Sequence, residues 1–254
     1  MDLGLKGKRA LITGATRGIG RAIAERLAAE GCDVAICARD AGQVETAVAA
    51  LAATGVRSWG AAVDVAEPAA LTRWVDEAAA ALGGVDILVT NASAMAAGAG
   101  PEVFRAHFNI DLMHTVNAVT VALPWLERSK SGAIVAIASV SGVEDWGYEE
   151  VAYGTMKAAL LYYMKGLARH VAPRGIRANV VSPGSIYFRG GVWEKTERED
   201  PKAFAETLQA NPFGRMGTPE EIANAVAFVV SPAAGFVAGA NFVVDGTLTR
   251  RVQN

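Results

Sequence analysis

A tyrosine and a lysine that lie four residues apart form the strongest candidate for a reaction centre in this chain. Tyr153 and Lys157 fall in a stretch that we expect to be helical, so both side chains leave the helix on one face. A free tyrosine has a pKa of about 10, and a nearby ammonium group favours the phenolate and lowers that pKa. Ser139 ends a predicted strand and can hydrogen-bond a substrate carbonyl or alkoxide. These three side chains suit proton exchange at a carbonyl or alcohol oxygen, although a Tyr-x-x-x-Lys pair alone is more often an ordinary surface pair.

A glycine-rich turn, Thr13–Gly20, lies between the first predicted strand and the first predicted helix. Its glycines let the backbone turn sharply and then pass close to a ligand and to the sheet. The start of the helix offers free N–H groups and the positive end of the helix dipole to a pyrophosphate. The turn therefore predicts a dinucleotide site, and its candidate binding residues are Gly14, Thr16, Arg17, Gly18, Ile19 and Gly20.

The end of the second predicted strand indicates which dinucleotide binds. An NAD-binding protein places an acidic residue there to hold the ribose 2′-hydroxyl. This chain has Ala38 followed by Arg39, and Arg17 lies in the glycine-rich turn. Two guanidinium groups suit a 2′-phosphate, so the sequence favours NADP(H) over NAD(H), with the adjacent Asp40 as the contrary signal.

Short apolar runs alternate with longer segments of helical periodicity along the chain. The predicted strands are Arg9–Ile12, Asp33–Cys37, Trp59–Val63, Asp86–Val89, Ala133–Ala138, Arg177–Val181 and Asn241–Val244. The predicted helices are Ile19–Leu27, Gln43–Ala53, Ala69–Leu82, Val103–Arg128 and Glu150–Val171, with one more starting at the capping box Thr218-Pro219-Glu220-Glu221. This alternation predicts a single α/β domain over residues 1–254, built on a parallel sheet with helices on both faces.

One segment, Ser185–Gly217, shows no clear periodicity. It is polar and contains Gly190-Gly191, Trp193 and a cluster of charges over 194–200. A loop of this length within a compact domain is typically a lid or a binding loop. We expect a substrate loop over about residues 185–217, and a surface insertion without function is the alternative.

Composition excludes several classes of protein. The 254 residues carry a net charge of −2 and are 52% hydrophobic, which argues against a disordered chain and against a nucleic-acid-binding face. The only two cysteines, Cys32 and Cys37, fit free thiols in the core. Met1–Arg9 does not resemble a secretory signal, and polar residues break the uncharged stretch Ile222–Val244 into a helix, a turn and a strand. We expect a cytoplasmic protein without a membrane segment.

Taken together, these motifs resemble the short-chain dehydrogenase/reductase family, of the type that has roughly this length. The resemblance covers essentially the whole chain. Beyond the glycine-rich turn, it rests on Asp64-Val65, Asn91-Ala92, Ser139, Tyr153-x-x-x-Lys157, Pro183-Gly184 and Val244-Asp245-Gly246. It implies a seven-stranded Rossmann sheet, hydride transfer between NAD(P)(H) and a carbonyl or alcohol, and a homotetramer or homodimer.

The resemblance also implies a role for each matching residue. Tyr153 would exchange the proton, Ser139 would orient the carbonyl, and Lys157 would bind the nicotinamide ribose and lower the pKa of Tyr153. Asp64 and Val65 would contact the adenine. The remaining cofactor contacts implied are Asn91 with Ala92, Pro183 with Gly184, and the backbone of Ile186.

The chain departs from the family pattern at several positions. The family's fourth catalytic residue, an asparagine, falls on Asp111, which could keep the backbone role of that residue, hold the Lys157 charge, or be a neutral variation; whether Asn109 substitutes for it is open. Ser93 replaces a glycine near the nicotinamide, and Phe188 replaces a threonine that would touch the carboxamide. Ser141 competes with Ser139 for the serine role, although the spacing to Gly142 favours Ser139.

Other signals are weaker. The histidines His107, His114 and His170 show no metal-ligand spacing, and we expect helix-face residues and no metal site. Glu144, Asp145, Glu149 and Glu150 could bind a cationic substrate, but a solvated acidic loop is the favoured interpretation. A bulky or apolar ketone is suggested by possible pocket residues Met95, Val143, Trp146, Tyr148, Tyr187, Phe188, Trp193 and Phe204.

Two alternative functions stay open. A 3-oxoacyl-[acyl-carrier-protein] reductase would need a basic patch for its acidic carrier, for which Arg128, Lys130 and Arg169 are sparse candidates. A dinucleotide-binding regulatory protein without turnover is disfavoured by the intact Ser139, Tyr153 and Lys157.

Overall fold

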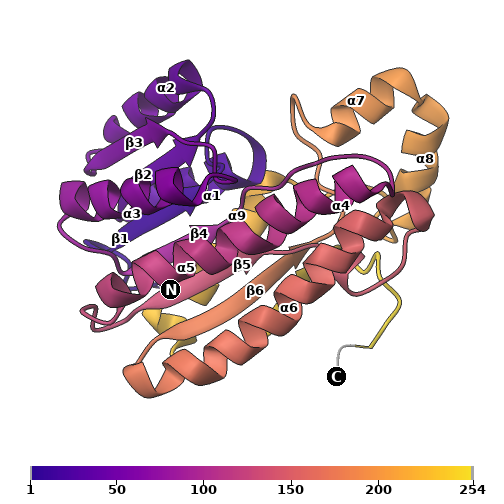
Figure 1. Ribbon diagram of the computed structural model, residues 1–254. Coiled ribbons are helices and arrows are strands. Elements are labelled where there is room, and N and C mark those ends of the chain that lie inside the picture. The colour runs from indigo at the N-terminus through magenta and orange to yellow at the C-terminus, as the bar shows by residue number, and fades with distance from the viewer. Residues whose placement is uncertain (1, 253–254) are drawn as a thin grey trace.

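The computed structural model describes residues 2–252 and contains the predicted seven-stranded parallel sheet, in the order β3-β2-β1-β4-β5-β6-β7 (Figure 1). The strands are β1 (Arg9–Thr13), β2 (Asp33–Ala38), β3 (Ser58–Ala62), β4 (Ile87–Thr90), β5 (Ala133–Ile137), β6 (Arg177–Pro183) and β7 (Asn241–Val244). Every pairing is parallel, and β1 pairs with both β2 and β4. The strand order therefore reverses at β1, the point where ligands bind in open α/β sheets.

Helices cover both faces of the sheet. The α-helices are α1 (Gly18–Ala29), α2 (Ala41–Ala52), α3 (Pro68–Leu82), α4 (Pro101–His107), α5 (His114–Leu126), α6 (Val151–Val171), α7 (Val192–Glu199), α8 (Pro201–Ala210) and α9 (Pro219–Val230). Helices α3, α5 and α6 pack on one face, and α1, α2 and α9 pack on the other. Alternate strand residues supply the two cores: Leu11 faces the first group of helices, and Ile12 faces the second.

The predicted strands and most helices are confirmed to within about two residues, a normal uncertainty for element ends. The Thr218 capping box forms as expected, with the Thr218 N–H donating to Glu221 Oε2 at 2.9 Å. Ile222–Val244 separates into the end of α9, a turn and β7. Within residues 2–252, no helix is long and apolar enough to span a bilayer. Cys32 and Cys37 are both buried free thiols.

Two predictions about secondary structure are corrected. The single helix predicted over Val103–Arg128 is interrupted by a π-helical turn, Phe108–Met113, which joins α4 to α5. The segment Ser185–Gly217 is not an unstructured loop, because it contains α7 and α8, with Asp200 capping α8 through the Ala203 N–H. Neither of these two helices buries a side chain fully, and α7 is strongly polar, so neither contains the apolar run that marks a core helix. Both helices lie beyond the ends of the strands, at the upper right of Figure 1.

Candidate active site

The glycine-rich turn joins the carboxyl end of β1 to the N-terminus of α1, at the point where the strand order reverses. Gly14 and Gly18 adopt positive φ angles of 65° and 54°, which disfavour other residues. A Cβ atom at Gly20 would lie 2.3 Å from the Gly14 carbonyl oxygen, so only glycine fits there. No side chain caps the first turn of α1, and its N–H groups are available to an anion. This close backbone turn fits a pyrophosphate.

Neighbouring polar groups hold the turn in place. Asn91, just after β4, donates its side-chain amide to the carbonyl oxygens of Thr13 and Gly14 at 3.1 and 2.9 Å. Its backbone N–H donates to Thr13 Oγ1 at 3.0 Å. Ala92 lies directly against Gly14, whose added Cβ would be 3.0 Å from the Ala92 Cα. Asn91 and Ala92 thus shape the turn from the adjacent strand.

Asp40, the acidic residue that follows β2, caps a helix. The carboxylate of Asp40 accepts a hydrogen bond from the Gln43 N–H at 2.9 Å and caps α2. Arg39 is exposed beside it, and Arg17 donates to the Gly190 carbonyl oxygen at 3.2 Å, between the turn and the segment that carries α7. A carboxylate that caps a helix is poorly placed to bind a ribose hydroxyl, whereas Arg17 and Arg39 are both exposed.

The other predicted cofactor residues lie at the same carboxyl edge, after β3 and β6. Asp64 is exposed and Val65 is buried. Gly184, next to Pro183, donates its N–H to the Val244 carbonyl oxygen at 3.0 Å. Ile186 is buried and forms an isolated parallel bridge with Gly217, which closes the base of the segment Ser185–Gly217.

Phe188 is placed by the structure on the glycine-rich turn. A Cβ atom at Gly18 would lie 2.6 Å from the Phe188 ring, so the ring rests directly on the Gly18 backbone. Together with the bond from Arg17 to Gly190, this contact holds the segment Ser185–Gly217 against the turn. The aromatic ring replaces a hydroxyl with an apolar surface beside the expected cofactor path.

Lys157 is a deeply buried charged group of the candidate reaction centre. Its side chain is 2% exposed, and its ammonium donates to the Ile137 carbonyl oxygen, at the end of β5, at 2.9 Å. Asp111 Oδ1 lies 3.1 Å from the Lys157 Nζ, and that carboxylate is completely buried. Burial lowers the pKa of Lys157, but the charge of Asp111 and then Tyr153 outweigh it and raise the pKa. The lysine therefore stays an ammonium ion.

Tyr153 lies one helical turn before Lys157 on α6, as the spacing predicts. The Lys157 Nζ is 5.4 Å from the centroid of the Tyr153 ring. The expected net fall in the pKa of Tyr153 is not found, because burial raises this pKa more than Lys157 and Ser139 lower it. Asp111 and Glu150 raise it further, so the phenol is neutral at neutral pH and can donate a proton.

Ser139 follows β5 and is nearly buried. Its Oγ accepts from the Ser141 N–H at 3.1 Å and donates to Ser141 Oγ at 3.3 Å. Ser139 is among the groups that lower the pKa of Tyr153. The arrangement favours Ser139 as the residue beside the tyrosine and gives Ser141 the role of holding it.

Asp111 and a histidine form a cluster that the sequence did not reveal. His107 was expected to be a helix-face residue, but it is 1% exposed, and its Nδ1 lies 2.7 Å from Asp111 Oδ2. Burial raises the pKa of Asp111, but Lys157 and the bond from His107 outweigh it and hold this pKa well below its usual range. The spacing of His107 and Asp111, one helical turn apart, was the signal that could have found the pair. Asn109, the alternative for the fourth position, makes no side-chain hydrogen bond within residues 2–252.

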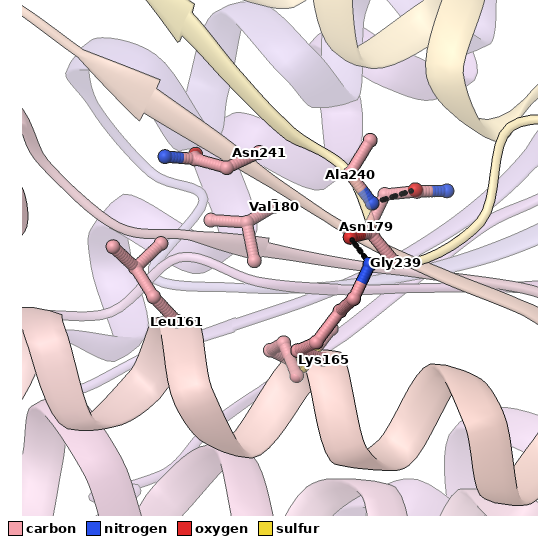
Figure 2. Close-up of a pocket in the computed structure, with 8 residues that line it drawn as sticks. Leu161, Lys165, Asn179, Val180, Gly239, Ala240 and Asn241 are labelled. Atoms are coloured by element: carbon pink, nitrogen blue, oxygen red, sulfur yellow. Dashed lines mark hydrogen bonds between the residues drawn. The ribbon is translucent and has the colours of Figure 1, made fainter. Parts of the chain in front are cut away.

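Two cavities of the molecule lie beside this centre. A small cavity of about 30 Å³ lies between α6 and the strands β6 and β7 (Figure 2). Lys165 there donates to the Gly239 carbonyl oxygen, and the Ala240 N–H donates to Asn179 Oδ1, both at 3.0 Å. A second, open cavity of about 350 Å³ is lined by residues 141–146 and the start of α6, but Tyr153 does not line it. In the described chain, no three His, Cys, Asp or Glu side chains are placed to hold a metal ion.

Comparison with known proteins identifies the family. A family model described as enoyl-(acyl carrier protein) reductase matches residues 14–249. The chain is 38% identical to isoepoxydon dehydrogenase of Penicillium expansum over 97% of this chain and 96% of that protein, and 35% identical to the 3-oxoacyl-[acyl-carrier-protein] reductase of Escherichia coli over 96% and 98%. A short-chain dehydrogenase from Burkholderia cenocepacia, solved with NADP, superposes with a TM-score of 0.89 at 35% identity, over 96% of this chain and 99% of that one. The chain therefore belongs to the short-chain dehydrogenase/reductase family of oxidoreductases, with its single Rossmann-type domain.

Proposed function

We propose that this protein is an NADP(H)-dependent oxidoreductase that interconverts a ketone and a secondary alcohol. The observation that carries the proposal is the cluster of Ser139, Tyr153 and Lys157 at the carboxyl edge of the sheet, next to a glycine-rich turn shaped for a pyrophosphate. The cofactor would supply or accept the hydride at its nicotinamide ring.

The side chains of the chain itself divide the remaining work. Tyr153, neutral in the free protein, would give its proton to the carbonyl oxygen during reduction and take it back during oxidation. Ser139 would hold that oxygen beside the phenol. Lys157 would bind the ribose hydroxyls and favour the phenolate as it forms, because its ammonium lies 5.4 Å from the Tyr153 ring.

The preference for NADP(H) is supported by charge at the end of β2. Arg39 and Arg17 offer guanidinium groups to a 2′-phosphate, and Asp40 is engaged in capping α2. The NADP complex of the Burkholderia relative is consistent with this proposal. The other cofactor contacts would come from the turn, from Asp64 and Val65, from Asn91 and Ala92, and from Pro183, Gly184 and Ile186.

The substrate is proposed to be bulky or apolar. Several large hydrophobic side chains are exposed in segments that follow the carboxyl ends of β4, β5 and β6, and a substrate that covered them would bury apolar surface. They are Met95, Trp146, Tyr148, Val192 and Phe213. The Tyr187 ring packs on Phe204 of α8 at 6.0 Å, and its hydroxyl donates to Glu197 of α7. This contact gives the segment Ser185–Gly217 an apolar centre suited to a lid.

A 3-oxoacyl-[acyl-carrier-protein] reductase is the second candidate, favoured by the similarity to the Escherichia coli enzyme. Its acidic carrier requires a basic docking surface. Arg128 is stacked on the Trp125 ring at 4.8 Å, and the net charge of the chain is −2. We therefore rank this activity below a ketone reductase. A regulatory protein without turnover ranks lowest, and a cytoplasmic homotetramer or homodimer is the assembly that we propose.

Initial rates across a substrate panel test the proposal. Aromatic, steroid and cyclic ketones, together with acyl thioesters, would be assayed with NADPH and with NADH in parallel. We expect an NADPH-linked rate on a ketone class. A rate confined to acyl thioesters would favour the carrier-protein activity, and tight nucleotide binding without turnover would favour the regulatory function.

A further inference from the structure

The two ring nitrogens of His107 both face hydrogen-bond acceptors. Nδ1 lies 2.7 Å from Asp111 Oδ2, and Nε2 lies 2.9 Å from the Ala96 carbonyl oxygen. A carbonyl oxygen cannot donate, and neither can an ionised carboxylate. Both hydrogen bonds therefore form only when both nitrogens carry a proton, which makes His107 an imidazolium ion.

His114, seven residues further along the chain, provides an internal contrast. Its Nδ1 lies 2.7 Å from the Ile110 carbonyl oxygen, and its Nε2 lies 2.9 Å from the Thr13 hydroxyl. The Thr13 Oγ1 accepts from the Asn91 N–H, so its own proton is free to point at His114. A neutral ring satisfies every one of these groups. Two equally buried histidines thus differ in charge because their partners differ.

The charge of His107 changes the electrostatic balance around Tyr153. Without it, Asp111 would neutralise Lys157 at 3.1 Å, and the phenolate of Tyr153 would gain little from the lysine. The centroids of the His107 and Tyr153 rings are 5.4 Å apart, and the Lys157 Nζ lies at the same distance from the Tyr153 centroid. Two cations and one anion leave one net positive charge beside the phenol.

We propose that His107 is a positioning residue: as an imidazolium it fixes the Asp111 carboxylate and offsets its charge, so that Lys157 can favour the phenolate of Tyr153. This rests on the proposed function, because it assigns Tyr153 as the proton-exchanging group. The other titratable groups near the phenol are Glu150, which precedes α6 and disfavours its ionisation, and the neutral His114. The loop over residues 91–100 carries no charged side chain.

Two further features agree with this assignment. Burial lowers the pKa of His107, but the hydrogen bonds to Asp111 and to the Ala96 carbonyl oxygen, with the charge of Asp111, together outweigh burial and raise the pKa. Asp111 Oδ2 also accepts from the Ala94 N–H at 3.2 Å. Asp111 Oδ1 faces the Lys157 ammonium and has no hydrogen-bond partner among residues 2–252. His107 thus binds one oxygen of the Asp111 carboxylate, and the other oxygen faces Lys157.

The charge state of His107 is measured directly by nitrogen-15 NMR of the histidine rings in the intact protein. With only three histidines, His107→Gln and His114→Gln variants assign the signals. At pH 7 we expect both His107 nitrogens to be protonated and His114 to be a single neutral tautomer. A neutral His107 at pH 7 would overturn the proposal, and this readout needs no substrate.

The effect on Tyr153 is measured by the phenolate absorbance of each protein, after subtraction of the same protein carrying Tyr153→Phe. His107→Gln should raise the Tyr153 pKa by about one unit, because it leaves Asp111 uncompensated. The double variant His107→Gln/Asp111→Asn should return the pKa to near the wild-type value, and His114→Gln should not move it. An unshifted pKa in His107→Gln, or a double variant as shifted as the single, would contradict the charge-balancing role.

Because this titration is independent of turnover, its failure is distinguishable from a failure of the proposed function. If a ketone substrate is found, the alkaline limb of kcat/KM for ketone reduction, in which Tyr153 must be protonated, should move by the same amount as the Tyr153 pKa. A purely structural role for His107 would lower kcat without moving that limb. If the limb stayed in place while kcat fell, the positioning role would be overturned.

Discussion

Two buried aspartates lie at opposite ends of the central sheet, and the groups around them differ in kind. At the amino edge, Asp86 accepts from the Arg9 backbone N–H, from two nitrogens of the Arg9 guanidinium and from the Ser129 hydroxyl. Burial raises the pKa of Asp86, but these hydrogen bonds outweigh it and lower the pKa. At the carboxyl edge, Asp111 lies between two cations, and its Oδ1 has an ion pair without a normal hydrogen bond.

The difference separates a structural charge from a functional one. The Asp86 cluster connects the start of β1 to β4 and to the segment before β5. Each oxygen of the Asp86 carboxylate already accepts two hydrogen bonds, so neither is free to bind another group. The His107–Asp111–Lys157 cluster holds two cations around one anion next to a phenol. Perturbed, incompletely satisfied groups of this sort concentrate at functional sites. Removal of Asp86 should therefore affect stability, and changes at the carboxyl edge should affect chemistry.

The largest effect is expected from Tyr153→Phe. Loss of the proton-exchanging hydroxyl should lower kcat by about a thousandfold, within the usual range for general acid–base groups. The nucleotide Kd and the free energy of unfolding should change little, since the ring is retained. Steady-state rates, nucleotide titration and chemical denaturation measure the three quantities. A variant that kept wild-type turnover would remove Tyr153 from the mechanism.

At the amino edge, Asp86→Ala should lower the free energy of unfolding by about 3 kcal/mol, because it leaves the partly buried Arg9 guanidinium without its partner. The kcat of the folded protein should stay at the wild-type value. The matched control is Arg57→Ala at the same edge, whose guanidinium is mostly exposed and should cost about 0.5 kcal/mol or less. Both free energies of unfolding would be measured by urea denaturation, and equal losses in the two variants would show that Asp86 has no special structural role.

His114 lies at the carboxyl edge, but its contacts with Thr13 and Ile110 are structural, so we expect it to affect stability. Burial lowers its pKa from 6.5 to about 4. Since the unfolded chain binds this proton at a higher pH than the folded chain, the stabilising contribution is complete above pH 6.5 and is lost as the pH falls towards 4. The loss amounts to about 3 kcal/mol at full extent. Denaturation at several pH values should show a shallower acid slope in His114→Gln, and an unchanged slope would contradict this assignment.

The smallest effect is expected at Arg39. Arg39→Ala should weaken NADPH binding by roughly tenfold and leave NADH binding unchanged, because only NADPH carries the 2′-phosphate. Fluorescence titration with both nucleotides measures the ratio, and Arg57→Ala again supplies a charge-matched control far from this edge. Equal losses for the two nucleotides would show that Arg39 does not bind the 2′-phosphate.

Much of this arrangement was predictable from local patterns. Apolar strands, glycine positions and the Tyr153–Lys157 spacing report on contacts within one element or one turn, and the sheet follows from them. The π-helical turn at Phe108–Met113 and the two helices of Ser185–Gly217 were missed, because the first keeps helical periodicity and the second buries little apolar surface. The ion pair of Asp111 with Lys157 joins elements far apart in the sequence, so spacing does not reveal it; only the family resemblance suggested that Asp111 could hold the Lys157 charge.

Deuteride transfer from the cofactor tests whether this protein reduces a ketone by hydride transfer with Tyr153 as the proton donor. NADPH labelled with deuterium at nicotinamide C4 would be incubated with a ketone substrate and either wild-type protein or Tyr153→Phe. We expect deuterium on the carbinol carbon of the alcohol formed by the wild type, and almost no alcohol from the variant. Unlabelled alcohol from the wild type with both C4 positions tested, or equal labelled product from the variant, would contradict it.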